Sequence, residues 1–186
     1  NAGVNITALV ASLGVGGIAI ALAVQTILSD VFASLSIGFD KPFEIGDFIV
    51  FGDVAGNVEH IGLKTTRIRS LSGEQIVCGN AILLQQTLHN YKRMQTRRIV
   101  FTFGVASDTP ADKLRVIGKM VKQIIVDVGE TKFDRAHLLG FESDRLMFEV
   151  VHIVNTADYN KYMDIQQEIN IRILEGLREQ GIKLAL

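Results

Sequence analysis

The chain begins with an uncharged, mostly apolar stretch, VNITALVASLGVGGIAIALAVQTIL, at residues 4–28, and its first charged side chain is Asp30. A helix of about 20 apolar residues crosses the hydrocarbon core of a bilayer, so this stretch is long enough to span a membrane. Its composition is unusual for a lipid-facing helix, because glycine and alanine occupy many positions and leave only a few large side chains. Small residues at helical spacing let neighbouring helices approach closely within a membrane. We therefore expect this stretch to pack against other helices.

A narrow, uncharged stripe formed by Ile18 and Leu22 appears when the stretch is placed on a helix that turns about 100° per residue. Small side chains flank the stripe on both sides. One flank holds Gly14, Gly17 and Ala21, and the other holds Val15, Ala19 and Ala23. One flank offers grooves and the other small knobs, as identical helices packed side by side in a ring would require. We interpret the stretch as a pore helix whose stripe faces the axis of the ring as an apolar constriction.

Two other interpretations of the same stretch remain open. A helix rich in alanine and glycine can be buried in a helical bundle that has no pore. The run at residues 14–19 also fits the G-x-G-x-x-A fingerprint of dinucleotide-binding enzymes, and it follows a strand-like segment at residues 9–13. That fingerprint needs a βαβ unit and an acidic residue about 20 positions on. Asp40 lies at a tolerable distance, but it follows an apolar helical segment and precedes Lys41 and Pro42, so no second strand ends there.

The composition of the whole chain bounds its class. Its 186 residues allow one large domain or two small ones, and its 48% hydrophobic content is high for a soluble protein. The net charge of −1 implies no general attraction to nucleic acid. A lone cysteine, Cys78, excludes an internal disulfide framework and fits a reducing compartment. The start lacks the features of a signal peptide. Because it begins at Asn1, we expect a portion of a longer protein with further lipid-facing helices upstream.

A second, amphipathic helix is expected after Gln25 and Thr26, which interrupt the apolar helix. Its apolar face comprises Leu28, Val31, Phe32, Leu35 and Phe39, opposite Ser29, Asp30, Ala33 and Ser36. This face could lie along the membrane–water boundary or against its neighbours. Pro42 ends the helix, because proline disfavours the helical conformation in the residue before it. Asp30 is the charge nearest to the constriction and is expected near the cytoplasmic mouth.

Short β-rich runs follow, separated by glycine-containing turns, at residues 48–51, 56–61, 65–69 and 75–78. They predict a small antiparallel β unit. Asn80 is expected to cap a short helix that runs through Leu88, and a basic linker follows from Tyr91 to Thr96.

The remainder has the order βαββαβ, which is the ferredoxin-like pattern. Strands are expected at residues 98–105, 137–141, 146–154 and 182–186. The first helix begins with a capping box at residues 109–112, and the second begins near Asp158 and ends at Gly181. The expected fold is therefore membrane α plus α/β: a pore-lining transmembrane helix and a following amphipathic helix at 1–40, a small β domain at 41–96 and a ferredoxin-like α/β domain at 97–186.

The segment KPFEIGD at residues 41–47 resembles the [RK]-P-F-x-x-G-[DE] signature of MscS-like small-conductance mechanosensitive channels. The signature positions here are Pro42, Phe43, Gly46 and Asp47. The patterns G-x-V-x-x-I-G at residues 56–62, T-x-I at 66–68 and G-x-x-I at 73–76 follow in the family's order. Residues 13–25 look like the family's pore-lining third transmembrane helix, and the βαββαβ segment resembles its C-terminal domain.

The resemblance implies a homoheptamer that opens a wide, weakly selective pore when membrane tension rises and so protects cells from osmotic stress. Its partners would be the lipid bilayer, permeating ions and other copies of the chain, with no cofactor. The full-length protein would cross the cell (inner) membrane several times and keep its C-terminal domain in the cytoplasm. The two constriction rings would fall on Ile18 and Leu22, and the hinge on Gln25 and Thr26. The helix-packing faces would be Gly14, Gly17 and Ala21 against Ala11, Val15 and Ala19.

Three departures from the family pattern affect these expectations. Thr26 stands where the family often has a glycine at the helix break, so the kink is expected to be less sharp or placed elsewhere. Gly79 replaces the usual proline before Asn80, which leaves that turn less rigid. The sequence also stops at Leu186, before the segment that forms a bottom barrel in many members.

Catalytic and metal-binding motifs are not found in the sequence. The four histidines have no metal-ligand spacing among themselves or with Cys78; they are His60, His89, His137 and His152. No nucleophile elbow, P-loop or zinc motif occurs. We therefore expect no enzyme. The alternative to a channel is a membrane-anchored, ligand-binding regulatory protein, because ferredoxin-like domains often bind small ligands in such proteins.

Overall fold

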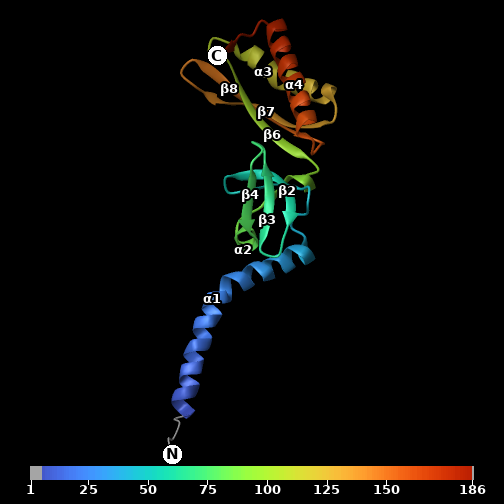
Figure 1. Cartoon of the computed structure of the whole chain (residues 1–186). Helices are drawn as coiled ribbons and strands as arrows, with labels where there is room; N and C mark the ends of the chain where they lie inside the picture. Colours follow the sequence, from blue (N-terminus) through green and yellow to red (C-terminus); the bar gives the residue numbers. More distant parts are fainter. Residues whose placement is uncertain (1–5, 186) are drawn as a thin grey trace, which may run out of the picture. The chain divides into compact units, whose positions relative to one another are not determined.

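The computed structural model describes residues 6–185 and divides the chain into two compact units at Lys92 and Arg93 (Figure 1). Unit 1 contains the long N-terminal helix and a five-stranded sheet, and unit 2 contains a four-stranded sheet with two helices. The expected helix start at Val4 and the last residue of the expected strand at 182–186 lie outside the described residues.

Helix α1 runs without interruption from Ile6 to Asp40. The expectation of two helices separated at Gln25 and Thr26 is therefore wrong, since the backbone is helical through both residues. Neither side chain removes a backbone N–H, as a proline would, so the helical hydrogen bonds can continue. Figure 1 shows instead that the ribbon of α1 changes direction along its length. The helix ends before Pro42 as expected, with Lys41 in a left-handed conformation (φ 46°) and its N–H bonded to the carbonyl of Ile37 at 2.9 Å.

The continuous helix also rules out the dinucleotide-binding interpretation. Residues 9–13 are helical, so no strand precedes the glycines at positions 14, 16 and 17. The fingerprint functions only between a strand and the start of a helix.

The sheet of unit 1 is antiparallel and has the order β4-β3-β2-β1-β5. Its strands are β1 (Phe48–Phe51), β2 (Val54–Ile61), β3 (Thr65–Ser70), β4 (Gln75–Gly79) and β5 (His89–Asn90). The short helix α2 (Asn80–Gln85) follows β4, and the 3-10 helix η1 (Tyr91–Arg93) follows β5. The core of this unit joins the end of α1 to the sheet and comprises Ile37, Phe43, Ile49, Phe51, Val58, Ile68 and Leu83.

Asn80 does not cap α2 as expected. The capping position is Gly79, which has no side chain to offer, and the Asn80 side chain is fully buried. There it accepts a hydrogen bond from Thr66 Oγ1 and donates one to the carbonyl of Gly62, both at 2.8 Å. Helix α2 also ends at Gln85 instead of Leu88, because His89 and Asn90 must be extended to pair with β1.

The sheet of unit 2 has the order β7-β8-β6-β9 with every neighbouring pair antiparallel, which confirms the ferredoxin-like arrangement. Its elements are β6 (Arg97–Ala106), α3 (Ala111–Val128), β7 (Thr131–Phe141), β8 (Arg145–Val154), α4 (Tyr159–Glu179) and β9 (Leu184–Ala185). Both helices pack their apolar faces against the sheet in one core, which includes Ile117, Val121, Ile125, Phe148, Val150, Ile169, Ile173 and Leu177.

Two local expectations for unit 2 differ from the structure. The capping box at the start of α3 does not form, because Thr109 Oγ1 donates to the carbonyl of Ala106 at 2.6 Å and Pro110 takes the capping position. Strand β7 begins at Thr131, before the expected residue 137. Its pairing with β8 shifts register between Phe133 and Arg135 and again between Leu138 and Gly140, and these irregularities hide the alternation that predicts a strand. Helix α4 begins near Asp158 as expected, and Asp158 caps it, since its Oδ1 accepts from the N–H groups of Asn160 and Lys161.

Candidate functional site

The first part of α1 presents an apolar surface that the rest of the described chain does not cover. Every side chain that the structure describes between Ile6 and Ser29 is exposed. Ile18 and Leu22, the expected constriction residues, are 64% and 65% exposed. By length and composition, α1 is the one helix in the described part of the chain that could cross a membrane. Such a helix needs lipid or other helices around it, because a large exposed apolar surface is unfavourable in water.

The glycines of α1 border open space within this chain. A Cβ atom added to Gly14, Gly16 or Gly17 would meet no atom within 4 Å. The remaining residues of the expected packing faces are exposed as well: Ala11, Val15, Ala19 and Ala21. Nothing in the described part of the chain therefore packs against these small residues.

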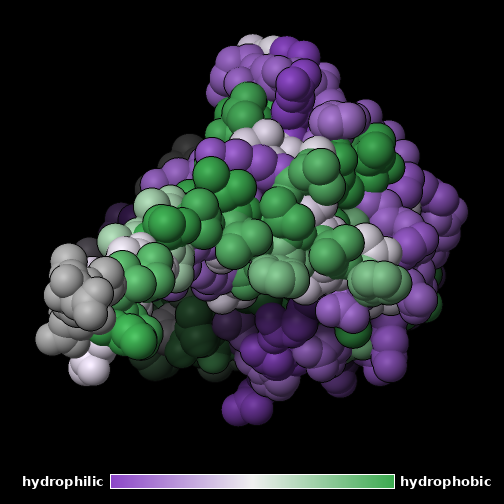
Figure 2. All heavy atoms as spheres, turned by 60° about the horizontal axis from the view of Figure 1, so that its bottom comes forward, coloured by the Kyte–Doolittle hydropathy of each residue, from purple (hydrophilic) through white to green (hydrophobic). Residues whose placement is uncertain are grey.

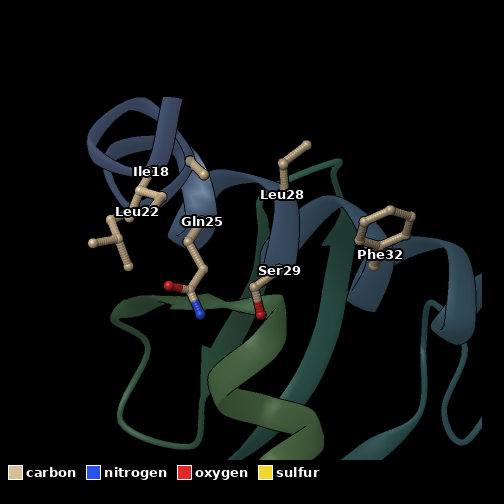
Figure 3. Close-up of a pocket in the computed structure, with 7 residues that line it drawn as sticks. Ile18, Leu22, Gln25, Leu28, Ser29 and Phe32 are labelled. Carbon is tan, nitrogen blue, oxygen red and sulfur yellow. The ribbon is translucent and has the colours of Figure 1, made fainter. Parts of the chain in front are cut away.

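An apolar groove runs along one side of α1 and joins the expected constriction to the expected hinge (Figure 3). Its lining residues are Ile18, Ala21, Leu22, Gln25, Leu28, Ser29 and Phe32. They recur at intervals of three or four positions, which is the spacing of one helix face. The structure thus brings Ile18, Leu22 and Gln25 onto the same face, whereas Thr26 does not line the groove.

The second part of α1 is fixed to the sheet of its own unit by its less apolar face. Asp30, Ala33 and Ile37 are buried there. Asp30 Oδ1 accepts a hydrogen bond from the N–H of Ala81 at 3.1 Å, and Ser34 Oγ donates to the carbonyl of Gly62 at 3.2 Å. The Asp30 carboxylate is therefore buried and engaged in a hydrogen bond, whereas its expected position near the cytoplasmic mouth stays a prediction. It supplies the cap that α2 lacks in its own sequence.

The apolar face expected for this part of the helix points away from the sheet. Leu28, Phe32, Leu35 and Phe39 are between 48% and 84% exposed. Figure 2 shows a continuous hydrophobic surface over α1. Because this face does not pack on the sheet of its own unit, both positions that the sequence left open for it remain: the membrane–water boundary and packing against its neighbours.

The signature residues form the turn that connects α1 to the sheet. Phe43 is buried in the core, and Gly46 adopts a φ of 91°, which favours glycine. Asp47 Oδ2 accepts from the N–H of Glu44 at 3.0 Å and from Asn90 Nδ2 at 2.7 Å. The same Asn90 amide donates to the carbonyl of Pro42 at 3.1 Å. These residues therefore have a structural role. No local pattern predicts their partner Asn90, which lies 43 positions after Asp47.

The titratable groups of the described chain do not form a reactive centre. No group of three or more histidine, cysteine or acidic side chains that could hold a metal ion occurs among the described residues. Burial, together with the nearby Asp30 carboxylate, raises the pKa of the Cys78 thiol, so it stays protonated at neutral pH. His152 is buried in the core of unit 2, and burial lowers its pKa.

Three family models match consecutive parts of the chain. They describe transmembrane helices 2/3 of mechanosensitive ion channels (residues 1–25), the beta-domain of mechanosensitive ion channels (26–93) and the C-terminal domain of the mechanosensitive ion channel MscS (99–184).

Similar curated proteins and solved structures carry the same description. The large-conductance mechanosensitive channel MscMJLR of Methanocaldococcus jannaschii is 33% identical over 190 residues, which cover 100% of this chain and 53% of that protein. The small-conductance channel MscMJ of the same organism is 33% identical over 98% of this chain and 53% of its own length. The chain thus spans about half the length of these relatives. Among solved structures, Arabidopsis thaliana MSL1 has a TM-score of 0.88 at 25% identity, covering 99% of this chain and 68% of that one. Helicobacter pylori MscS in its closed state has a TM-score of 0.81 at 24% identity, covering 99% and 72%.

Proposed function

The chain belongs to the MscS family of mechanosensitive ion channels, and we propose that its helix α1 lines a pore that opens when membrane tension rises. The observation that carries this proposal is the first part of α1. It is uncharged, its described side chains are exposed in the single chain, and its glycines border open space. A ring of such helices would bury the small flanks between copies and turn Ile18 and Leu22 toward a common axis.

The proposed assembly is a homo-oligomer, with seven copies expected from the family resemblance. Gly14, Gly17 and Ala21 of one copy would contact Ala11, Val15 and Ala19 of the next. Residues 1–40 would provide the pore helix and its amphipathic continuation, 41–96 the β domain and 97–186 a cytoplasmic domain. The full-length protein would lie in the cell (inner) membrane with further transmembrane helices, and it would release solutes during osmotic stress.

The proposed gate is a dry constriction. Water in a narrow apolar pore loses hydrogen bonds that it cannot replace, so the pore can empty and block ions without being closed sterically. Ile18 and Leu22 are one helical turn apart and would form two such rings. Strong ion selectivity usually requires rings of charges or carbonyl groups. Neither ring carries a charge, and Asp30 is engaged with α2, so the proposed pore is weakly selective.

Serine substitutions at the two rings test the gate. Ile18→Ser and Leu22→Ser keep the helix but give water a hydrogen-bond partner, and each removes aliphatic packing worth about 1 kcal/mol or more per buried side chain. Summed around a ring, even a fraction of this shifts gating strongly, because each 1.4 kcal/mol changes an equilibrium about tenfold. We expect both variants of the complete protein to open at lower tension in patch recordings from reconstituted membranes.

Ile18→Leu is the matched control for these recordings, because it preserves an aliphatic side chain of the same size and should leave the tension threshold nearly unchanged. If both serine variants opened at the tension of the unmodified protein, the gate would lie at other residues.

A further inference from the structure

A fully buried histidine lies in unit 2. His152 is on β8 and is 0% exposed. It pairs across the sheet with Ile99 of β6 and Phe133 of β7, and the ring of Phe101 meets its imidazole edge to face with centroids 6.0 Å apart. Its surroundings are therefore those of a hydrophobic core.

The hydrogen bonds of a neighbouring amide determine which nitrogen of His152 carries the proton. On α4, Gln166 uses its Nε2 to donate to Asn170 Oδ1 at 2.9 Å. Gln166 therefore turns its oxygen, Oε1, toward His152 Nε2 at 3.0 Å. An oxygen can only accept, so Nε2 is the protonated nitrogen of the neutral ring. Nδ1 is then a bare acceptor, and within the described residues it is buried without a hydrogen-bond partner.

The charged groups on the surrounding elements would not stabilise a second proton on this ring. Lys122 of α3 lies over the ring of Phe133 at 5.9 Å, and Arg97 of β6 lies over Tyr159 and Tyr162 of α4. Both are cations. Glu149 of β8, the same strand as His152, and Asp134 of β7 both form ion pairs with Arg135. An imidazolium at position 152 would thus add a positive charge to a core in which none of the described carboxylates of unit 2 is buried.

We propose that His152 makes the packing of α4 on the sheet sensitive to acid. The neutral ring holds α4 against β8 through its hydrogen bond to Gln166, and protonation of the ring weakens the packing of both elements. Protonation would place an N–H at Nδ1 in the core where no acceptor faces it, and a buried unsatisfied donor is costly. The Gln166 bond joins β8 directly to α4, so these two elements are affected first. This inference does not depend on the proposed channel function.

The direction of the pH effect follows from linkage. Burial lowers the pKa of His152 in the folded unit from its ordinary value of 6.5, and the Gln166 bond opposes this shift only in part. The unfolded chain therefore takes up the proton first. Stability contributed by the neutral ring is fully present above about pH 6.5 and decreases as pH falls below it, until the folded form is also protonated. In that range the equilibrium constant for folding of unit 2 decreases by up to about tenfold for each pH unit, because one proton is involved.

Amide hydrogen exchange of the complete protein in detergent, between about pH 7.5 and 5.5, tests the proposal when rates are corrected for their intrinsic pH dependence. We expect protection of the amides in β8 and α4 to fall by up to about tenfold per pH unit below 6.5, with a smaller change in β2 and β3 of unit 1. His152→Gln retains a neutral N–H donor for Gln166 and should remove the pH slope. His137→Gln is the matched control, because His137 lies exposed on β7 of the same sheet, and it should leave the slope unchanged.

A second variant keeps the test decisive if His152→Gln folds poorly. Gln166→Glu places a carboxylate at the Nε2 side of the ring, stabilises the imidazolium and should reduce the slope. A flat profile in the unmodified protein, or an undiminished slope in His152→Gln or Gln166→Glu, would overturn the proposal.

Discussion

Among the described glycines of the β unit, Gly56 has the least room for a side chain. A Cβ at this position would lie 2.2 Å from the carbonyl oxygen of Arg69 on the neighbouring strand and 2.9 Å from the Ile68 side chain. Strands β2 and β3 would have to separate to admit it, because the obstructing atoms belong to the backbone. The sequence identified Gly56 as part of a family pattern, but the close approach of β3 became visible only once the strands were paired.

We expect Gly56→Ala to destabilise unit 1 by about 1–3 kcal/mol, which is the usual cost of overpacking a core. Gly38→Ala is the control, because a Cβ there meets nothing within 4 Å and the position is helical. Alanine within a helix is more favourable than glycine by up to about 1 kcal/mol, so this variant should be neutral or slightly stabilising. Thermal unfolding in detergent measures both, and equal melting temperatures would contradict the backbone contact.

Elements were predictable where a local pattern determines them and unpredictable where a distant partner does. Strands β1 to β4 follow from β-rich runs between turns, so they were predicted, and so was the start of α4 near Asp158. The face of α1 that packs on the sheet was not predicted, because most of the large apolar side chains of the helix lie on the opposite face. Its orientation depends on the orphan N–H of Ala81 and the carbonyl of Gly62, which lie 51 and 28 positions from their partners Asp30 and Ser34.

The hydrogen bond from the N–H of Ala81 in α2 to Asp30 in α1 can be tested by substitution. Asp30→Ala leaves the Ala81 N–H without an acceptor, and loss of such a cap usually costs about 0.5–2 kcal/mol. Asp30→Asn retains an oxygen in the same place and should lose much less. We expect amide exchange at Ala81 in the complete protein to accelerate in the alanine variant, by about tenfold for each 1.4 kcal/mol lost. Similar exchange in both variants would mean that the carboxylate does not cap α2.

At the scale of the whole molecule, the fold was largely predictable from the sequence and the site was only partly predictable. The βαββαβ order determines the ferredoxin-like sheet of unit 2 almost alone, because every element except the first part of β7 has a recognisable period. The candidate pore residues were likewise predicted from a single pattern, the helical periodicity of α1. What a single chain does not provide is the surface against which those residues pack, and this surface decides the role of each glycine in α1.

Substitutions at Gly17 test whether copies of the chain assemble through α1. If Gly17 lies at a close contact between neighbouring helices, a leucine there must push the helices apart, whereas alanine adds only one methyl group. Within one chain the two substitutions should differ little, because a Cβ at Gly17 meets open space. A large difference between them would therefore report on contacts between copies.

We expect the complete protein and Gly17→Ala to migrate as one closed oligomer in mild detergent, and Gly17→Leu to shift toward smaller species. Light scattering combined with size-exclusion chromatography measures the mass of each species directly. The unfolding temperature of unit 2, which lies outside the helix contact, should be the same in all three proteins and serves as the folding control. A monodisperse monomer of the unmodified protein would contradict the ring, and an unchanged oligomer in Gly17→Leu would move the helix contact to another face of α1.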